Sequence, residues 1–152
     1  MLKQKYGRIV NMSPPISMEM LPGKVAYCIS KFGMSLQSIG LGQELVGSGV
    51  TVNSLWPATL IESQATINFG MGSPEQWRKA SILADATLEI IKSDENGKCL
   101  IDELFLRERG VTDFSKYSCV EGVDPPKMLL VENVEMGKAG DSSNKINFKS
   151  KL

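Results

Sequence analysis

VTVNSLW, which runs from Val50 to Trp56, is the stretch that decides the fold. It is a short apolar run that follows Gly49 and stops at Pro57. Short runs of this kind, bounded by turn residues, are typical of a buried β-strand. We therefore predict a buried strand over 50–56, with a long loop after it.

The residues before this strand follow a helical period from Lys24 to about Val46, and glycines at 47 and 49 end the pattern. Apolar side chains lie on two opposite faces of this predicted helix. One face carries Val25, Ile29, Phe32, Leu36 and Ile39, and the other carries Tyr27, Lys31, Met34, Ser38, Leu41 and Leu45. A helix that is apolar on both sides needs a cover on each side. We therefore expect other elements to pack against both faces.

Two more strands are predicted on either side of this unit. GRIVNMS at 7–13 is apolar and stops at a Pro-Pro pair, and KCLID at 98–102 follows a turn. A second helix is predicted from Ser73 to about Lys92, because serine, proline and an acid open it in the order that helix starts favour. A short helical piece is expected at 104–109.

The order strand, helix, strand, helix, strand predicts an α/β fold with a parallel sheet and crossover helices. Three parallel strands make a small sheet, so the pattern indicates a partial Rossmann-type doubly wound sheet. Apolar density falls after Val131. We expect one domain over 1–131 and a flexible tail over 132–152.

Composition excludes several classes of function. Seventeen basic and seventeen acidic side chains balance, without long runs of like charge, so we expect no nucleic-acid partner. No apolar run reaches the roughly 18 residues of a membrane span, and the first residues lack the apolar stretch of a secretory signal. The absence of histidine excludes a Ser-His-Asp triad and histidine-bound zinc. Three widely spaced cysteines favour neither a disulfide framework nor a CxxC site, so we expect no metal.

Four other side chains could belong to a functional site, but we expect two of them to pack in the core and two to be solvated. Trp56 and Trp77 could stack on a substrate, but a strand-end and a helix tryptophan more often pack in a core. Asp102 and Glu103 could form a carboxylate pair. Because adjacent residues at a strand end point apart, we expect both to be solvated.

Tyr27 and Lys31 are the candidate catalytic pair. Their four-residue spacing puts both side chains on one face of the predicted helix. A tyrosine with a pKa near 10 is a poor base at neutral pH, but a nearby ammonium lowers that pKa and makes the phenol a usable proton donor or acceptor. The spacing alone is weak evidence, since such pairs also occur as surface contacts.

The surrounding segments decide whether Tyr27 and Lys31 form a proton-transfer pair or a surface contact. GRIVNMS, AYCISKFGM and GVTVNSLWP, in this order, resemble the C-terminal half of the short-chain dehydrogenase/reductase family over about Gly7 to Leu130. The resemblance implies an NAD(P)-dependent oxidoreductase that interconverts carbonyl and hydroxyl groups, with lipid-related substrates as one expectation. It implies that Tyr27 transfers the proton, and that Lys31 holds the cofactor ribose and lowers the tyrosine pKa. By the same resemblance, Pro57, Thr59 and Ile61 lie beside the nicotinamide.

The sequence departs from the family pattern at several positions. Pro14 stands where the family has a carbonyl-polarising serine, and proline can donate no hydrogen bond. Ser13 and Ser17 are the two candidates for a substitute donor. Ala58 and Glu62 replace a glycine and a threonine of the family, which puts the phosphate contact in doubt.

The Gly-rich turn of a dinucleotide site is not found, so the resemblance covers a domain lacking its N-terminal nucleotide-binding half. We therefore expect the isolated chain to be inactive, and two hypotheses stay open. The chain is either part of an oxidoreductase or a non-catalytic dimerisation or interaction module derived from that family. In both, the helix at 24–46 is expected to form a homo-oligomer.

The last three residues, Ser150, Lys151 and Leu152, form the SKL peroxisomal address. They predict the peroxisomal import receptor as a partner and the peroxisome as location, with cytoplasm or mitochondrion as alternatives. This address requires an exposed, flexible end, which the polar tail would provide.

Overall fold

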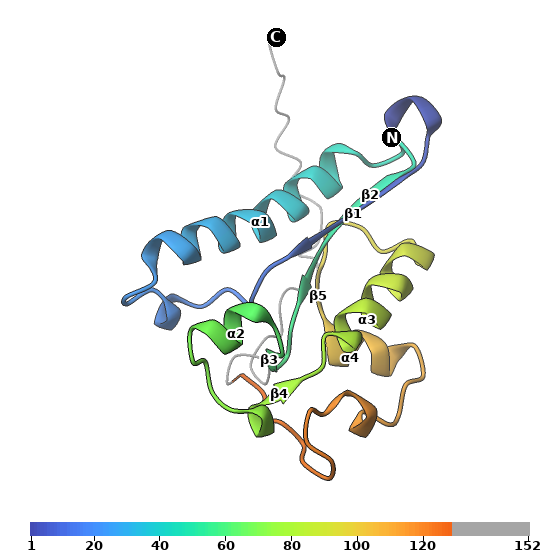
Figure 1. Ribbon diagram of the computed structural model, residues 1–152. Helices are drawn as coiled ribbons and strands as arrows, with labels where there is room; N and C mark the ends of the chain where they lie inside the picture. Colours follow the sequence, from blue (N-terminus) through green and yellow to red (C-terminus); the bar gives the residue numbers. More distant parts are fainter. Residues whose placement is uncertain (129–152) are drawn as a thin grey trace.

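A three-stranded parallel sheet forms the centre of the computed structural model, which describes residues 1–128. Its strands are β1 (Gly7–Met12), β2 (Val50–Trp56) and β5 (Cys99–Ile101), in the order β1-β2-β5 (Figure 1). The three strands predicted from sequence are confirmed to within one residue at either end. The α/β class with a small parallel sheet is confirmed with them.

Helices cover both faces of this sheet (Figure 1). The long helix α1 (Val25–Glu44) lies on one face, while α3 (Ser81–Lys92) and α4 (Asp102–Glu108) lie on the other. The second face holds the main apolar core, because alternate strand residues such as Leu55 point toward α3 and α4. The buried members of this core are Leu55, Ile82, Ala86, Ile90, Phe105, Leu106, Phe114 and Tyr117.

The covered face of α1 consists mainly of small residues. Its buried residues are Cys28, Phe32, Ser35, Ser38 and Gly42. The apolar stripe predicted over Val25, Ile29 and Leu36 is exposed instead, with 56%, 66% and 62% of each side chain accessible. The sheet therefore covers a narrow face between the two predicted stripes, and the prediction that α1 has apolar cover on both sides is wrong within residues 1–128.

Ser35 joins α1 to the strands beneath it. Its hydroxyl lies 2.7 Å from that of Ser13 and accepts a hydrogen bond from the Trp56 indole at 3.0 Å. One turn further along, the Asn11 amide donates to the Ser38 hydroxyl at 2.9 Å. These bonds satisfy polar groups that the close approach of helix and sheet buries.

The segment predicted as one helix over 73–92 contains three elements. Ser73 does cap a helical start, but only the 3₁₀ turn η3 (Pro74–Gln76) follows it. Trp77–Arg78 then forms strand β4, which pairs in parallel with β3 (Leu60–Ile61), and α3 begins at Ser81. The chain leaves the helical conformation here because the buried Trp77 indole donates to the Met71 carbonyl at 2.8 Å, which draws it toward the preceding loop.

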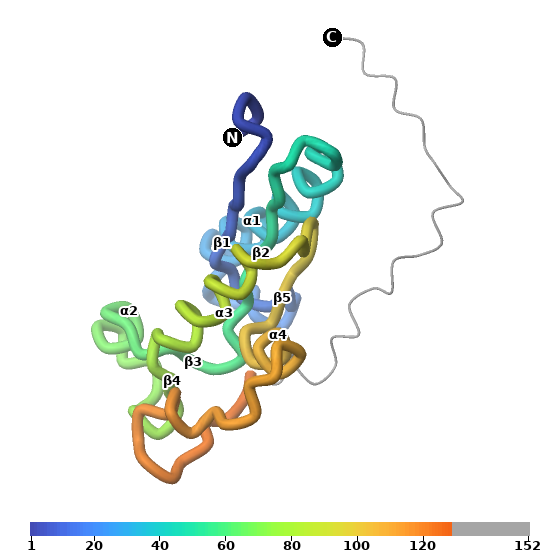
Figure 2. Tube along the Cα trace, turned by 90° about the vertical axis from the view of Figure 1, so that its right-hand side faces the viewer, coloured from blue at the N-terminus to red at the C-terminus, as the bar shows by residue number. Residues whose placement is uncertain are grey.

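Several short elements lie outside the main sheet and its helices. Helix α2 (Gln64–Asn68) lies with β3 and β4 to one side of the main sheet (Figure 2). Three further 3₁₀ turns are η1 (Leu2–Gln4), η2 (Met18–Met20) and η4 (Ser115–Tyr117). Among residues 1–128, none of the helices is both long and apolar enough to cross a membrane. The predicted tail at 132–152 and its final SKL lie outside the described residues.

The contact between α1 and the turn before β5 leads to a stability prediction. A Cβ atom at Gly42 would clash with the Gly97 backbone, whereas a Cβ atom at Gly40 would meet nothing within 4 Å. We expect Gly42→Ala to lower the free energy of unfolding by roughly 1–3 kcal/mol through overpacking. Gly40→Ala, the matched control, should raise it by about 0.5–1 kcal/mol through helix propensity. Urea denaturation measures both, and equal effects of the two variants would contradict the tight contact.

Candidate active site

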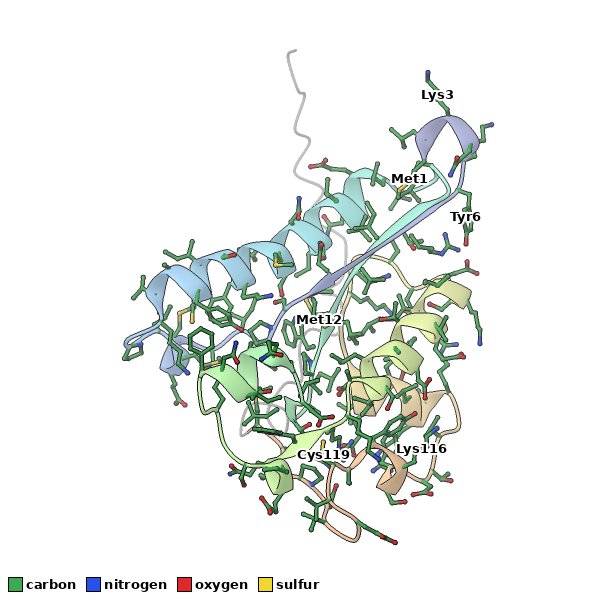
Figure 3. All side chains as sticks on the ribbon, in the orientation of Figure 1. Met1, Lys3, Tyr6, Met12, Lys116 and Cys119 are labelled. Carbon is green, nitrogen blue, oxygen red and sulfur yellow. The ribbon has the colours of Figure 1, made fainter. Side chains whose placement is uncertain are left out.

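A cavity of about 810 Å³ opens at the carboxyl ends of β1 and β2. Parallel sheets place ligand sites at this edge. Residues from α1, α2, β3 and the connecting loops form its wall, and Met12 at the end of β1 lines it from the centre of the molecule (Figure 3). The wall includes Ser13, Pro14, Lys24, Tyr27, Lys31, Pro57, Thr59, Ile61, Ser63, Thr66 and Phe69. The structure thus gathers most of the predicted site residues around one space.

Tyr27 and Lys31 both face this cavity from the first two turns of α1. The Lys31 ammonium donates a hydrogen bond to the Met12 carbonyl at 3.0 Å, which fixes the long side chain across the end of β1. The Tyr27 side chain is half exposed. Partial burial, and next the nearby Cys28 thiol, raise the pKa of Tyr27 above its ordinary value. The lowered pKa of Tyr27 that the family resemblance implies is therefore not seen in this arrangement, in which the Lys31 ammonium bonds to the Met12 carbonyl.

The three predicted cofactor-side residues lie together on the opposite wall. Pro57 and Thr59 follow β2 directly, and Ile61 ends β3. Thr59 is 1% exposed, and its hydroxyl donates to the Leu60 carbonyl at 3.1 Å. The Thr59 hydroxyl is therefore already bonded within the loop, and Pro57 and Ile61 present apolar side chains to the cavity.

The two substitute donors have other hydrogen-bond partners. The Ser13 hydroxyl lies at the cavity edge, but it is directed at α1, where it bonds to the Lys31 carbonyl at 2.9 Å and to Ser35. Ser17 caps η2 by accepting from the Glu19 backbone N–H at 3.2 Å, and it does not line the cavity. Pro14 lines the wall without a donor.

A buried ionic cluster lies behind the Pro57–Thr59 wall, and sequence reasoning missed it. Asp102 and Glu103 begin α4 with 0% and 1% of their surface exposed, so the expectation that both are solvated is wrong. Glu103 pairs with the buried Arg78 at 2.8 Å and with Arg107 at 2.7 Å. Arg78 lies on a strand of only two residues, which is too short to show alternating polarity in the sequence. The sequence pattern therefore gave no signal for this cluster.

The two acids of this cluster differ in their proton affinity. Burial would raise the pKa of Glu103, but hydrogen bonds from Arg107 and Lys127 and the charge of Arg78 together lower it. For Asp102 burial dominates and raises the pKa from 3.8 to about 6, although the N–H groups of Ala58 and Glu103 and the Arg78 charge oppose it. The folded chain therefore binds a proton between about pH 4 and 6 that the unfolded chain has released. Stability falls as pH rises through this window, by on the order of 3 kcal/mol at Asp102.

Two features of the cavity bear on whether a dinucleotide cofactor fits it. The Lys31 ammonium uses one N–H on the Met12 carbonyl and keeps two for other acceptors, such as ribose hydroxyls, and Pro57 and Ile61 give the cavity wall apolar side chains. Within residues 1–128 no strand leads through a Gly-rich turn into a helix, the arrangement that binds pyrophosphate. The same residues contain no cluster of three or more acidic or thiol side chains arranged to hold a metal.

Known proteins share sequence with this chain over most of its length. The sequence model of the short chain dehydrogenases matches residues 1–70. Mouse hydroxysteroid dehydrogenase-like protein 2 is 39% identical over 125 residues, which cover 79% of this chain and 25% of that protein. The chain thus spans about a quarter of this relative.

Two solved structures share the fold. A short chain dehydrogenase from Mycobacterium thermoresistibile is 35% identical, with a TM-score of 0.67 over 80% of this chain and 45% of that one. A protein from Xanthomonas campestris described as a dehydrogenase is 29% identical, with a TM-score of 0.72 over 84% of this chain and 49% of that one. The chain, with its parallel sheet and these similarities, belongs to the short-chain dehydrogenase family.

Proposed function

We propose that this chain forms the proton-transfer and nicotinamide-binding part of an NAD(P)-dependent oxidoreductase that interconverts carbonyl and hydroxyl groups. Members of its family generally bind NAD(P). The observation that carries the proposal is the single cavity shared by Tyr27 and Lys31 on one wall and by Pro57, Thr59 and Ile61 on the other. A substrate carbonyl in this space would lie between a proton donor and a cofactor surface.

Tyr27 is the group best placed to move the proton. The cavity-lining hydroxyls of Ser13, Thr59 and Thr66 are all bonded to backbone carbonyls or neighbouring side chains. Among residues 1–128, the Tyr27 hydroxyl makes no such bond, so it is free to donate to a substrate oxygen. A nicotinamide cofactor held beside Lys31 and Pro57 would supply a hydride for the carbonyl carbon, and Tyr27 would give its proton to the carbonyl oxygen. A Lys31 ammonium released from Met12 would stabilise the remaining phenolate.

The cavity wall favours an apolar substrate. Met12, Met20, Phe69, Met71 and Met128 all line it, and thioether side chains adapt to ligands of different shape. Lys24 at the wall adds one exposed cation that suits an acidic end group. We therefore propose lipid-related carbonyl compounds, with a long apolar part and one polar end, as the substrate class.

A non-catalytic interaction module is the second candidate. Val25, Ile29 and Leu36 form an exposed apolar stripe along α1, which would be buried if two copies of the chain packed through this helix. We propose a homo-oligomer through α1 under either function. Import into peroxisomes through residues 150–152 is a separate proposal that rests on sequence alone.

The oxidoreductase proposal predicts cofactor binding that depends on Lys31. We expect NADPH or NADH to bind the full chain saturably, and Lys31→Ala to weaken binding roughly tenfold by removing a charged hydrogen-bond donor. Isothermal calorimetry and cofactor fluorescence measure the binding. Lys3→Ala is the matched control, because Lys3 lies on η1 at the far end of β1 from Met12 (Figure 3).

Two results would separate the candidates. Binding that is equally weakened by Lys3→Ala and Lys31→Ala, or no binding by a folded sample, would reject the oxidoreductase proposal for this chain. If turnover of an apolar ketone is measured, Tyr27→Phe should retain cofactor binding and lose about 10²-fold or more in kcat.

The oligomer proposal predicts that a charge in the α1 stripe separates the copies. Ile29→Glu should convert a dimer to a monomer in sedimentation velocity, because burying an unpaired carboxylate is costly. Gln37→Glu adds the same charge at another exposed position of α1 and should leave the dimer intact. A monomeric wild-type chain at micromolar concentration would contradict this proposal.

A further inference from the structure

Asp102 connects the buried cluster to the cavity wall. One oxygen of its carboxylate accepts hydrogen bonds from the Ala58 backbone N–H at 2.9 Å and the Glu103 backbone N–H at 2.6 Å. Its other oxygen, Oδ2, is buried and has no hydrogen-bond partner within residues 1–128. Asp102 therefore holds one point of the loop after β2 with a single oxygen.

The residue that Asp102 holds lies between two residues of the cavity wall. Ala58 is flanked by Pro57 and Thr59, and its carbonyl accepts a hydrogen bond from the Met128 backbone N–H at 2.9 Å. Met128 lines the same cavity. Movement at Ala58 would therefore displace three wall residues that come from two distant parts of the sequence.

The charges around Asp102 leave it without a direct ion pair. Arg78 pairs with Glu103 at 2.8 Å and with Asp124 at 2.9 Å, while Arg107 and Lys127 contact the second Glu103 oxygen at 2.7 and 3.0 Å. All three cations are thus engaged by the other acids, and within residues 1–128 no salt bridge reaches Asp102. An asparagine could accept the same two hydrogen bonds without the cost of a buried charge, so fold stability alone does not explain a carboxylate here.

We propose that Asp102 is a positioning residue: its ionised carboxylate holds the Pro57–Thr59 wall of the cavity through the Ala58 N–H, and its protonation loosens that wall. Hydrogen bonds to an ionised acceptor are roughly twice as strong as those to a neutral one. A proton on the unpartnered Oδ2 leaves Oδ1 as a weaker, uncharged acceptor. Burial raises the pKa of Asp102 to about 6, so the carboxylate is ionised above this pH and neutral below it. Any effect of this loosening on catalysis rests on the proposed function. The coupling between Asp102 protonation and the wall does not depend on it.

The test is an NMR titration of the full 152-residue chain between pH 4.5 and 8, without ligand. It follows the Asp102 carboxyl carbon, the Ala58 amide proton and the methyl groups of Thr59 and Met128. We expect all four signals to titrate with one common midpoint near pH 6, and the Ala58 amide to exchange with solvent at least severalfold faster below that midpoint. A flat Ala58 signal, or a midpoint different from that of the Asp102 carboxyl carbon, would overturn the proposal.

Asp102→Asn removes the titrating carboxyl group but keeps a side-chain oxygen that can accept the hydrogen bonds from Ala58 and Glu103. We expect the variant to hold the Ala58, Thr59 and Met128 signals near their low-pH wild-type positions at every pH. Asp94→Asn makes the same substitution at a fully exposed side chain and should leave the wild-type titration unchanged. Titration of Ala58 that persists in Asp102→Asn would reject Asp102 as its cause.

Glu103→Gln adds a graded variant. The Glu103 charge raises the pKa of Asp102, so its removal should shift the common midpoint to lower pH without abolishing the titration. If Asp102→Asn does not fold, coincidence of the four wild-type midpoints still decides the question. If the same samples fail to bind cofactor, the oxidoreductase proposal is rejected. The proposal about Asp102 would still stand, because none of these NMR signals depends on a cofactor.

Discussion

The close packing of α1 on the sheet is the contact on which the site depends. Ser35 bonds to the ends of β1 and β2, and Gly42 allows the far end of the helix to touch the turn at Gly97. A helix is rigid over its length, so these contacts also fix the height of its first turns above the strand ends. Lys31 lies one turn before Ser35 and reaches the Met12 carbonyl for this reason. A bulkier interface would have lifted Tyr27 and Lys31 away from the cavity.

The opposite wall is fixed by charge. Arg78, Glu103 and Asp124 join β4, α4 and the segment before Met128 into one unit, and Asp102 ties that unit to Ala58. The Arg78–Glu103 pair is buried on both sides, and such pairs seldom add much net stability, since desolvation offsets their attraction. Removing one partner is costly, because it leaves a buried charge without compensation. The cavity therefore has one wall held by small hydroxyl residues and one held by buried ions.

The elements with a clear period were predictable from sequence, and those held by long-range contacts were not. Val50–Trp56 and the 20-residue helix α1 carry enough residues for a repeating pattern, and both were predicted nearly to their ends. Trp77 and Arg78 form a strand of only two residues, which is too short to show a repeating sequence pattern. Their conformation depends on partners 6 to 46 residues away in the sequence, so the prediction of a helix over these residues is wrong. Tyr27 and Lys31 could be placed on one helix face from their spacing, and both line the cavity, but only the resemblance of the surrounding segments singled them out as candidate site residues. Asp102 was missed because only the fold brings it to Ala58.

The order of the strands also bears on how the chain is made. β2 lies between β1 and β5, yet β5 follows it by about 40 residues in the sequence. At a synthesis rate of roughly 5–20 residues per second, β2 would wait on the order of 2–8 s on the ribosome with one edge open. Open strand edges can pair with other chains. Until Cys99–Ile101 emerges, the seven-residue strand β2 forms an open edge of the sheet, and afterwards the three-residue strand β5 forms that edge. The nascent protein therefore presents a longer open edge before β5 is made than after it, which makes this interval the natural point for a chaperone to act.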